Sequence, residues 1–113
     1  MPPDDRARLH HMLGAARGAL AYAEGRSRHA LAPSAIETHG LVRLIEIVGE
    51  AAARVSPGAR AGLPGIDWPA MVGMRNRLVH GYYDIDLDVV WRTVTRDLPP
   101  LVAVLERHLA GDA

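Results

Sequence analysis

Cysteine, lysine and phenylalanine are among the residue types missing from this chain of 113 residues. Without cysteine the chain has no disulfide and no thiolate metal site, which favours a reducing compartment. All 13 basic residues are arginine, and 13 acidic residues balance them to a formal net charge of zero. A neutral chain lacks the broad positive field of many nucleic-acid-binding proteins. Any contact with RNA is therefore expected to come from a local cluster of arginines.

Long apolar runs are also missing, because no stretch approaches the roughly 20 residues that a membrane-spanning helix needs. The N-terminal segment has no basic region followed by an apolar run, so no signal peptide is expected. These absences predict a soluble, cytoplasmic protein without membrane contact. With only two Trp and three Tyr, the core is expected to be aliphatic, as in packed helices. At this length the sequence predicts one domain over residues 1–113.

Apolar residues recur at steps of three and four, which predicts an all-α protein. The first helix is expected over residues 4–24, and a broadly apolar, central second helix over residues 34–54. Glu46 and Glu50, four residues apart, share one face of the second helix. A carboxylate on a central helix is costly unless it has a partner.

Two further helices complete a predicted up-and-down four-helix bundle. Asp67 is a candidate N-cap for a third helix over residues 68–80, which Gly81 would end. Asp86 is a candidate cap for the fourth helix. That helix is expected to be kinked or split at Pro99 and Pro100, because proline cannot donate the helical hydrogen bond.

The most informative segment is residues 75–82, which reads RNRLVHGY. It contains Arg75, His80 and Tyr82 at the spacing Arg-x4-His-x-Tyr. An arginine can neutralise a phosphate oxygen at any cellular pH, and a histidine can give or take a proton near neutrality. These two side chains are the minimum needed to cleave a phosphodiester without a metal ion.

Helical geometry predicts that this site is shared between two chains. On an ideal helix five residues advance about 500°, so Arg75 and His80 would lie roughly 140° apart and on different faces. Asn76, one turn before His80, would lie beneath the imidazole and could orient it. For both catalytic side chains to reach one substrate, Arg75 must curl around the helix end or two protomers must combine their motifs. The second arrangement predicts a homodimer with a composite cleft.

Several blocks in a fixed order carry a resemblance to a known family. The sequence resembles the HepT-like family of the HEPN superfamily from about residue 36 to residue 109. The blocks are IEIVGEAA at 45–52, GIDW at 65–68, GMRNRLVHGY at 73–82, VW at 90–91 and DLP at 97–99. The separate blocks make the match more specific than the short motif alone.

The resemblance implies a dimeric helical toxin whose motif lies in a cleft between protomers and which acts as a metal-independent endoribonuclease. It implies catalytic roles for Arg75 and His80. It also implies a partner, an MntA-like minimal nucleotidyltransferase antitoxin that attaches AMP to the motif tyrosine, here Tyr82. Glu50 matches the family's Gly-Glu-Ala block, and two interpretations stay open for it. It either supports Arg75 or His80, or forms a structural ion pair with an arginine on another helix.

The expected mechanism needs no cofactor and no metal. His80 would act as a base on the ribose 2′-hydroxyl or as an acid on the leaving 5′-oxygen, while Arg75 stabilises the phosphoryl charge. The alternating Asp84, Asp86 and Asp88 are interpreted as a helix cap and dipole partners rather than metal ligands. The alternative function is a non-catalytic, nucleotide-binding module that is the partner and substrate of the nucleotidyltransferase.

Overall fold

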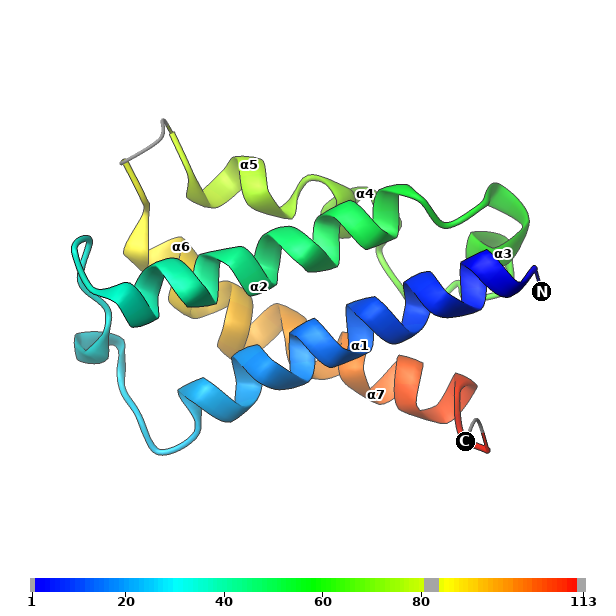
Figure 1. Cartoon of the computed structure of the whole chain (residues 1–113), viewed down its shortest axis with the longest axis horizontal. Coiled ribbons are helices and arrows are strands. Elements are labelled where there is room, and N and C mark those ends of the chain that lie inside the picture. The colour runs from blue at the N-terminus through cyan, green and yellow to red at the C-terminus, as the bar shows by residue number, and fades with distance from the viewer. Residues whose placement is uncertain (1, 81–83, 112–113) are drawn as a thin grey trace.

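The computed structural model describes residues 2–80 and 84–111, and this part of the chain is almost entirely helical. The two longest helices, α1 (Pro3–Ala23) and α2 (Ile36–Ala53), run antiparallel and pack closely side by side (Figure 1). A short 3-10 turn, η1 (Arg28–Ala30), lies in the connection between them. Both long helices are close to the ranges that the apolar periodicity predicts.

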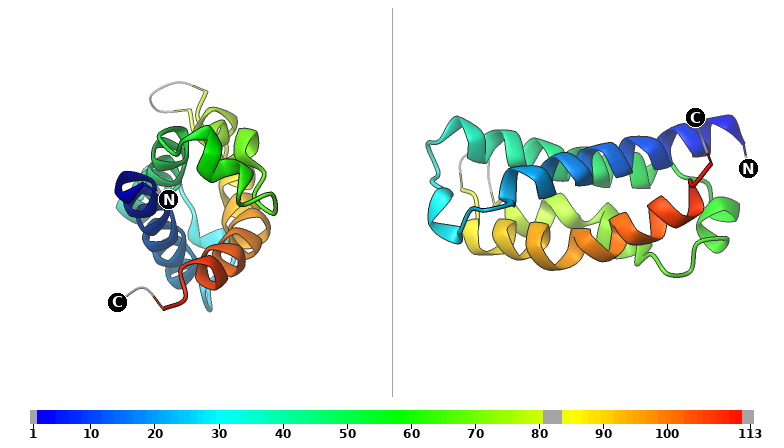
Figure 2. Two further views of the ribbon diagram at one scale, coloured as in Figure 1. Left: turned by 90° about the vertical axis from the view of Figure 1, so that its right-hand side faces the viewer. Right: turned by 90° about the horizontal axis from the view of Figure 1, so that it is seen from below.

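Shorter helices form the other two sides of the bundle. Viewed end-on, all of them surround one central axis (Figure 2). The third side packs on α2 and consists of α4 (Trp68–Val72) and α5 (Met74–Leu78). The fourth side packs on α1 and consists of α6 (Leu87–Arg92), the π-helical turn η2 (Thr93–Asp97) and α7 (Leu98–His108). The predicted all-α, up-and-down bundle is therefore confirmed.

Aliphatic side chains from all four sides fill the core, as the scarcity of aromatic residues predicts. Leu9, Met12, Leu41, Ile45, Met74, Leu78, Leu98 and Leu105 are among the largest side chains that are fully buried. α5 contributes two of them, Met74 and Leu78, so its inner face is fixed by packing while its outer face stays exposed. Among the described residues, no helix combines the length and apolar character needed to cross a membrane.

The backbone of α4 lies directly on α2 at Gly49. A Cβ atom built on Gly49 would lie 3.1 Å from the carbonyl oxygen of Met71 and 3.5 Å from that of Val72. A side chain at this position would push α4 outward, because the atoms it meets belong to the backbone. The absence of a side chain at Gly49 therefore sets how closely the third side approaches α2.

The third helix differs from its prediction at two points, so the single helix over residues 68–80 is wrong. It is interrupted at Gly73, and α5 ends at Leu78 because Val79 is extended, with φ −126° and ψ 116°. Val79 forms an antiparallel bridge with Ile85. The His80 N–H donates to the Asp84 carbonyl, and the Asp86 N–H donates to the Leu78 carbonyl, both at 2.8 Å. His80 therefore follows the helix instead of ending it. Gly81, the predicted stop, lies outside the described residues.

The fourth helix is split, as predicted, but the irregular turn lies before the prolines. Asp86 caps α6 by accepting a hydrogen bond from the Val89 N–H at 3.1 Å, which confirms the predicted cap. In η2 the helix widens, and the Leu98 N–H donates to the Thr93 carbonyl five residues earlier. Pro99 and Pro100 then occupy the first turn of α7, where a missing N–H is tolerated.

A short helix, α3 (Pro57–Ala61), occupies part of the connection that the sequence predicts as a loop. Its N-cap is Ser56, whose hydroxyl accepts from the Ala59 N–H at 3.3 Å. The Ser56 hydroxyl also donates to one Asp5 carboxylate oxygen at 2.6 Å, and the Ser56 N–H donates to the other at 2.8 Å. The start of α1 is thereby joined to the connection after α2.

Candidate functional site

Arg75 is fixed along one edge of its guanidinium group and free along the other. Its Nε donates to Oε2 of Glu46 at 3.0 Å, which links α5 to α2. The Glu46 side chain is 23% exposed, whereas that of Arg75 is 51% exposed. Neither Nη nitrogen bonds to a described residue. Arg75 is therefore oriented by a carboxylate while its remaining N–H donors can bind a phosphate oxygen.

Glu46, and not Glu50, makes the contact with Arg75 that was one interpretation of Glu50. Glu50 accepts a hydrogen bond from Arg43 Nη1 at 3.0 Å, and both side chains are more than half exposed. Arg43 lies two turns earlier on α2, so the pair joins residues of one helix, not of two. Glu46 and Glu50 lie one turn apart, and only the packing of α5 on α2 decides which of them meets Arg75.

His80 is exposed and lies two residues beyond the end of α5. Its backbone is fixed by the hydrogen bond to Asp84, while its imidazole bonds to no described residue. The predicted angle of 140° between Arg75 and His80 therefore does not apply. Asn76 is exposed on α5, and the prediction that it lies one helical turn beneath His80 is wrong because the helix ends between them.

Tyr82, the predicted modification site, lies outside the described residues. What the structure does define is the pairing on either side of it, between residues 78–80 and 84–86. Two of the acidic side chains in this region have structural partners. Asp86 caps α6, and Asp88 accepts a hydrogen bond from Arg28 Nε at 2.6 Å. Among the described residues, no group of three or more His, Asp or Glu side chains is arranged to hold a metal ion.

Among the described motif residues, Arg77 is the one that lines the pockets near α5. It is two residues from Arg75, a step of about 200° on a helix, so the two arginines point in nearly opposite directions. Arg77 Nη2 donates to the Ala70 carbonyl at 3.0 Å, and its side chain lines two pockets on the side of α5 that faces η2. The sequence gives Arg77 no separate role, although its opposite direction follows from helical periodicity.

The chemistry available at this end of the bundle is therefore simple. One half-exposed guanidinium offers free N–H donors, and one exposed imidazole can accept or donate a proton. Both belong to a segment of six residues whose ends are fixed by Glu46 and by the pairing with Asp84. This combination suits binding of a phosphate group and proton transfer beside it.

Curated proteins similar to this chain are named as ribonucleases. A protein of Methanocaldococcus jannaschii named "Putative RNase MJ1380" is 28% identical over 103 residues, which cover 91% of this chain and 94% of the relative. "Probable ribonuclease HepT" of Thermococcus cleftensis is 36% identical over 67 residues, or 59% of this chain and 61% of the relative. "Putative RNase TTE0752" of Caldanaerobacter subterraneus subsp. tengcongensis is 27% identical over 96 residues, or 85% of this chain and 86% of the relative.

No solved structure gives a significant match to the chain. The family model described as Ribonuclease HepT-like matches residues 12–108, a range that contains every sequence block and both proposed catalytic residues. The family predicted from the motif blocks is confirmed: this chain belongs to the HepT-like ribonuclease family.

Proposed function

We propose that this protein is a metal-independent endoribonuclease in which Arg75 and His80 are the catalytic residues. The observation that carries the proposal is the state of Arg75: Glu46 holds its Nε edge, and its Nη groups bond to no described residue. His80 adds an imidazole that no described residue engages. Membership in a ribonuclease family supplies the substrate class, which is RNA.

The mechanism follows from these two side chains. His80 removes the proton from a ribose 2′-hydroxyl, whose oxygen attacks the adjacent phosphorus. Arg75 donates hydrogen bonds to the phosphoryl oxygens as negative charge develops on them. The bond from phosphorus to the 5′-oxygen breaks, and that oxygen takes a proton from water. The products are a 2′,3′-cyclic phosphate and a 5′-hydroxyl, and no metal is required. Asn76, with its exposed amide, is proposed to orient His80 or the substrate. A supporting role for Glu50 stays a prediction.

The test is cleavage of a mixed RNA set by the purified protein in the presence of a chelator. Wild type should cut, and the single variants Arg75→Ala and His80→Ala should each lose cleavage. His108→Ala is the matched control, because it removes an exposed histidine from the end of α7. Loss of wild-type cleavage in the chelator would contradict the metal-independent mechanism. The identity of the 5′ end, a hydroxyl or a phosphate, tests the direction of bond breakage.

We further propose that two protomers form the complete site. Arg75 and His80 are exposed, and neither lines any of the three pockets described on this chain. A second protomer would cover them and exclude water from the reaction. If each site combines Arg75 of one protomer with His80 of the other, mixing Arg75→Ala with His80→Ala should restore about a quarter of the wild-type activity. That fraction assumes free exchange of subunits in a two-fold dimer. A fully active monomer would rule out the composite cleft.

Control of the nuclease is proposed to act through Tyr82. Adding AMP beside the site would introduce bulk and negative charge, and both oppose an anionic substrate. An MntA-like nucleotidyltransferase is the proposed antitoxin partner of this toxin. Incubation with that enzyme and ATP should increase the mass by one or more AMP groups and stop cleavage. Tyr82→Phe should abolish the mass increase, whereas Tyr83→Phe, the adjacent control, should retain it.

The alternative proposal is a non-catalytic, nucleotide-binding module that is only the partner and substrate of the nucleotidyltransferase. The zero net charge favours it, because nothing in the overall charge attracts RNA. The same assays separate the two proposals. Modification at Tyr82 without cleavage of any RNA by the unmodified protein supports the module, whereas cleavage that depends on His80 excludes it.

A further inference from the structure

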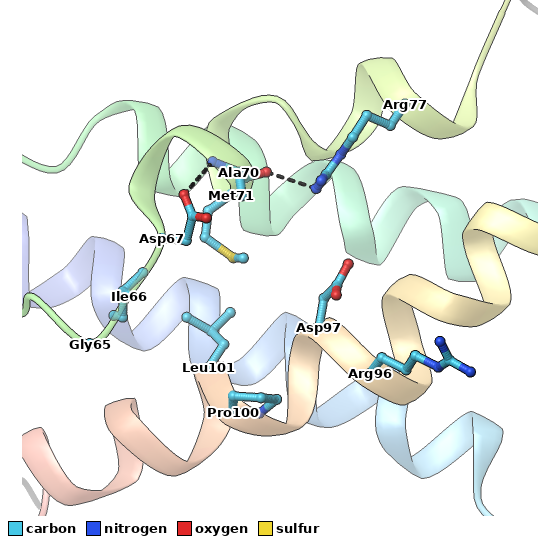
Figure 3. A pocket seen from close by; sticks show the side chains of 10 residues that line it. All are labelled: Gly65, Ile66, Asp67, Ala70, Met71, Arg77, Arg96, Asp97, Pro100 and Leu101. Atoms are coloured by element: carbon cyan, nitrogen blue, oxygen red, sulfur yellow. Dashed lines mark hydrogen bonds between the residues drawn. The ribbon is translucent and has the colours of Figure 1, made fainter.

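Two adjoining pockets form one groove between α4–α5 and η2. One has a volume of about 300 Å³ and the other about 350 Å³. Both are lined by Arg77, Arg96 and Asp97, so they share a boundary and together form the α5/η2 groove. Figure 3 shows the first of the two pockets. Arg92 lines the second pocket. One wall of the groove is therefore the same short helix that carries the catalytic Arg75.

The second pocket gathers positively charged side chains, although the net charge of the chain is zero. Three arginines, Arg77, Arg92 and Arg96, line it together with one carboxylate, Asp97. Within the part of the chain that the structure describes, Arg92 and Arg96 form no ion pair. By contrast, Arg17, Arg28, Arg43 and Arg75 are each paired with a carboxylate. The groove therefore holds cations that the fold does not neutralise, which is the local cluster that RNA contact requires.

The π-helical turn determines how this wall is presented. Arg96 and Asp97 belong to η2, and Arg92 directly precedes it. π-helical turns are rare and frequently occur at functional sites. In Figure 3 the Asp97 side chain projects toward the opposite wall, and the Arg96 side chain points away from it along the groove. The wider turn thus places Arg96 and Asp97, neither of which forms an ion pair within the described residues, at the junction of the two pockets.

The first pocket has a different character. Ile66, Met71, Pro100 and Leu101 line one part of it, and Arg77 crosses its edge to reach the Ala70 carbonyl. The carboxylates of Asp67 and Asp97 also line it. An apolar section next to the cationic second pocket matches the chemistry of a single RNA strand, which presents a flat base next to a charged phosphate.

We propose that the α5/η2 groove binds the sugar–phosphate backbone of single-stranded RNA on the face of α5 opposite Arg75, with phosphates on Arg92 and Arg96. The proposal rests on the proposed ribonuclease function and adds the path of the substrate to it. Asp97 opposes this binding by charge repulsion, so it weakens the hold on RNA. Arg77 is already anchored by Ala70 and presents its charge with little loss of side-chain freedom.

One other groove is a rival for the same role. It lies between α1 and α2 and is lined by Arg8, His11, Arg43, Glu50 and Arg54, together with Ile47 and Ala51. Glu50 neutralises Arg43, which leaves Arg8 and Arg54 as its main cations. Its lining includes no residue of α5. The double variant Arg8→Ala/Arg54→Ala therefore removes the same charge as Arg92→Ala/Arg96→Ala and is the matched control.

The experiment measures binding of a labelled single-stranded RNA over a salt series, with every variant made in the His80→Ala background to prevent cleavage. Losing two phosphate contacts should weaken binding roughly ten- to thirtyfold at about 0.1 M salt and reduce the log–log salt slope by about 1.4. Arg92→Lys/Arg96→Lys should retain most of the affinity, because lysine keeps the charge. Asp97→Asn should tighten binding. The control Arg8→Ala/Arg54→Ala should change affinity by less than about threefold.

Each outcome decides between these alternatives. If the control weakens binding and Arg92→Ala/Arg96→Ala does not, RNA lies in the rival groove and the proposal is overturned. Unchanged binding in both double variants overturns it as well. An Asp97→Asn variant that binds no tighter contradicts its electrostatic basis. If the wild-type protein cleaves RNA and the groove variants bind RNA with normal affinity, only this inference is wrong. A protein that neither binds nor cuts RNA would remove the proposed function with it. Melting curves of each variant show whether a loss comes from unfolding.

Discussion

Arg75 on α5 donates its Nε hydrogen bond to Oε2 of Glu46 on α2, across 3.0 Å. The contact joins two helices through Nε, and neither Nη group bonds to a residue that the structure describes. An arginine held in this way is oriented before the substrate arrives, so less side-chain freedom is lost when a phosphate binds.

Glu46→Ala is expected to lower kcat by about ten- to a hundredfold, because Arg75 loses the group that orients it. KM should change much less, since Glu46 itself is not expected to touch the substrate. Glu46→Gln should recover part of kcat, because the amide oxygen still accepts the hydrogen bond. Glu106→Ala, which breaks the exposed pair with Arg17, is the control and should cut normally. A rise in KM of about ten- to a hundredfold with unchanged kcat would contradict the positioning role.

Gly49→Ala is expected to destabilise the protein by roughly 1–2 kcal/mol, because the added Cβ meets the Met71 carbonyl of α4 at 3.1 Å. Gly40→Ala is the matched control on the same helix, where an added Cβ meets nothing within 4 Å. It should stabilise the fold by about 0.5–1 kcal/mol, because alanine is the better helix former. Denaturant unfolding of both variants measures the contrast. If the two substitutions shift stability in the same direction by the same amount, α4 does not press on α2 as closely as the structure indicates.

Asp5 is expected to make stability depend on pH in the acidic range. Its carboxylate is buried, and the hydrogen bonds from the Ser56 hydroxyl and the Ser56 N–H lower the pKa of Asp5 from its ordinary value of 3.8. Because the folded-state pKa lies below the unfolded one, this contact stabilises the fold fully above the unfolded value. Its contribution is lost as the pH falls through the folded value.

Asp5→Asn should therefore lower the Tm at pH 7, and the difference from wild type should shrink as the pH falls below 3.8. The adjacent Asp4→Asn is the control, since Asp4 is exposed in the same first turn of α1. If the Tm difference between Asp5→Asn and wild type stayed constant down to pH 2, the charge of the Asp5 carboxylate would not be what Ser56 stabilises.

Features that depend on neighbours along the chain were predictable from the sequence. Asp67 and Asp86 cap their helices as predicted, because a cap needs only its own oxygen and an N–H group three residues later. The split of the fourth helix was predictable for the same reason, since Pro99 and Pro100 lack the donors of a regular helix. The turn η2 was not, because a widened turn has no comparable signal in the sequence.

The end of the motif helix was mispredicted because its cause lies elsewhere in the chain. Helical periodicity and Gly81 extend the helix to residue 80, but Val79 leaves it to pair with Ile85. Residues 79–80 can either continue the helix or pair with residues 84–86. Which of the two is more stable depends on how both segments pack on the bundle. The predicted angle of 140° between Arg75 and His80, and the predicted place of Asn76 beneath His80, both assumed a helix that reaches residue 80. Both predictions are therefore wrong.

The sequence by itself determined the all-α class and the family, because apolar periodicity and motif spacing are properties of the linear chain. Tertiary structure alone decided which carboxylate holds Arg75, since Glu46 and Glu50 share a helix face and only the position of α5 separates them. It also gathered Arg77, Arg92 and Arg96 into one groove. No spacing rule brings side chains of different helices together, because their distance is set by how the helices pack.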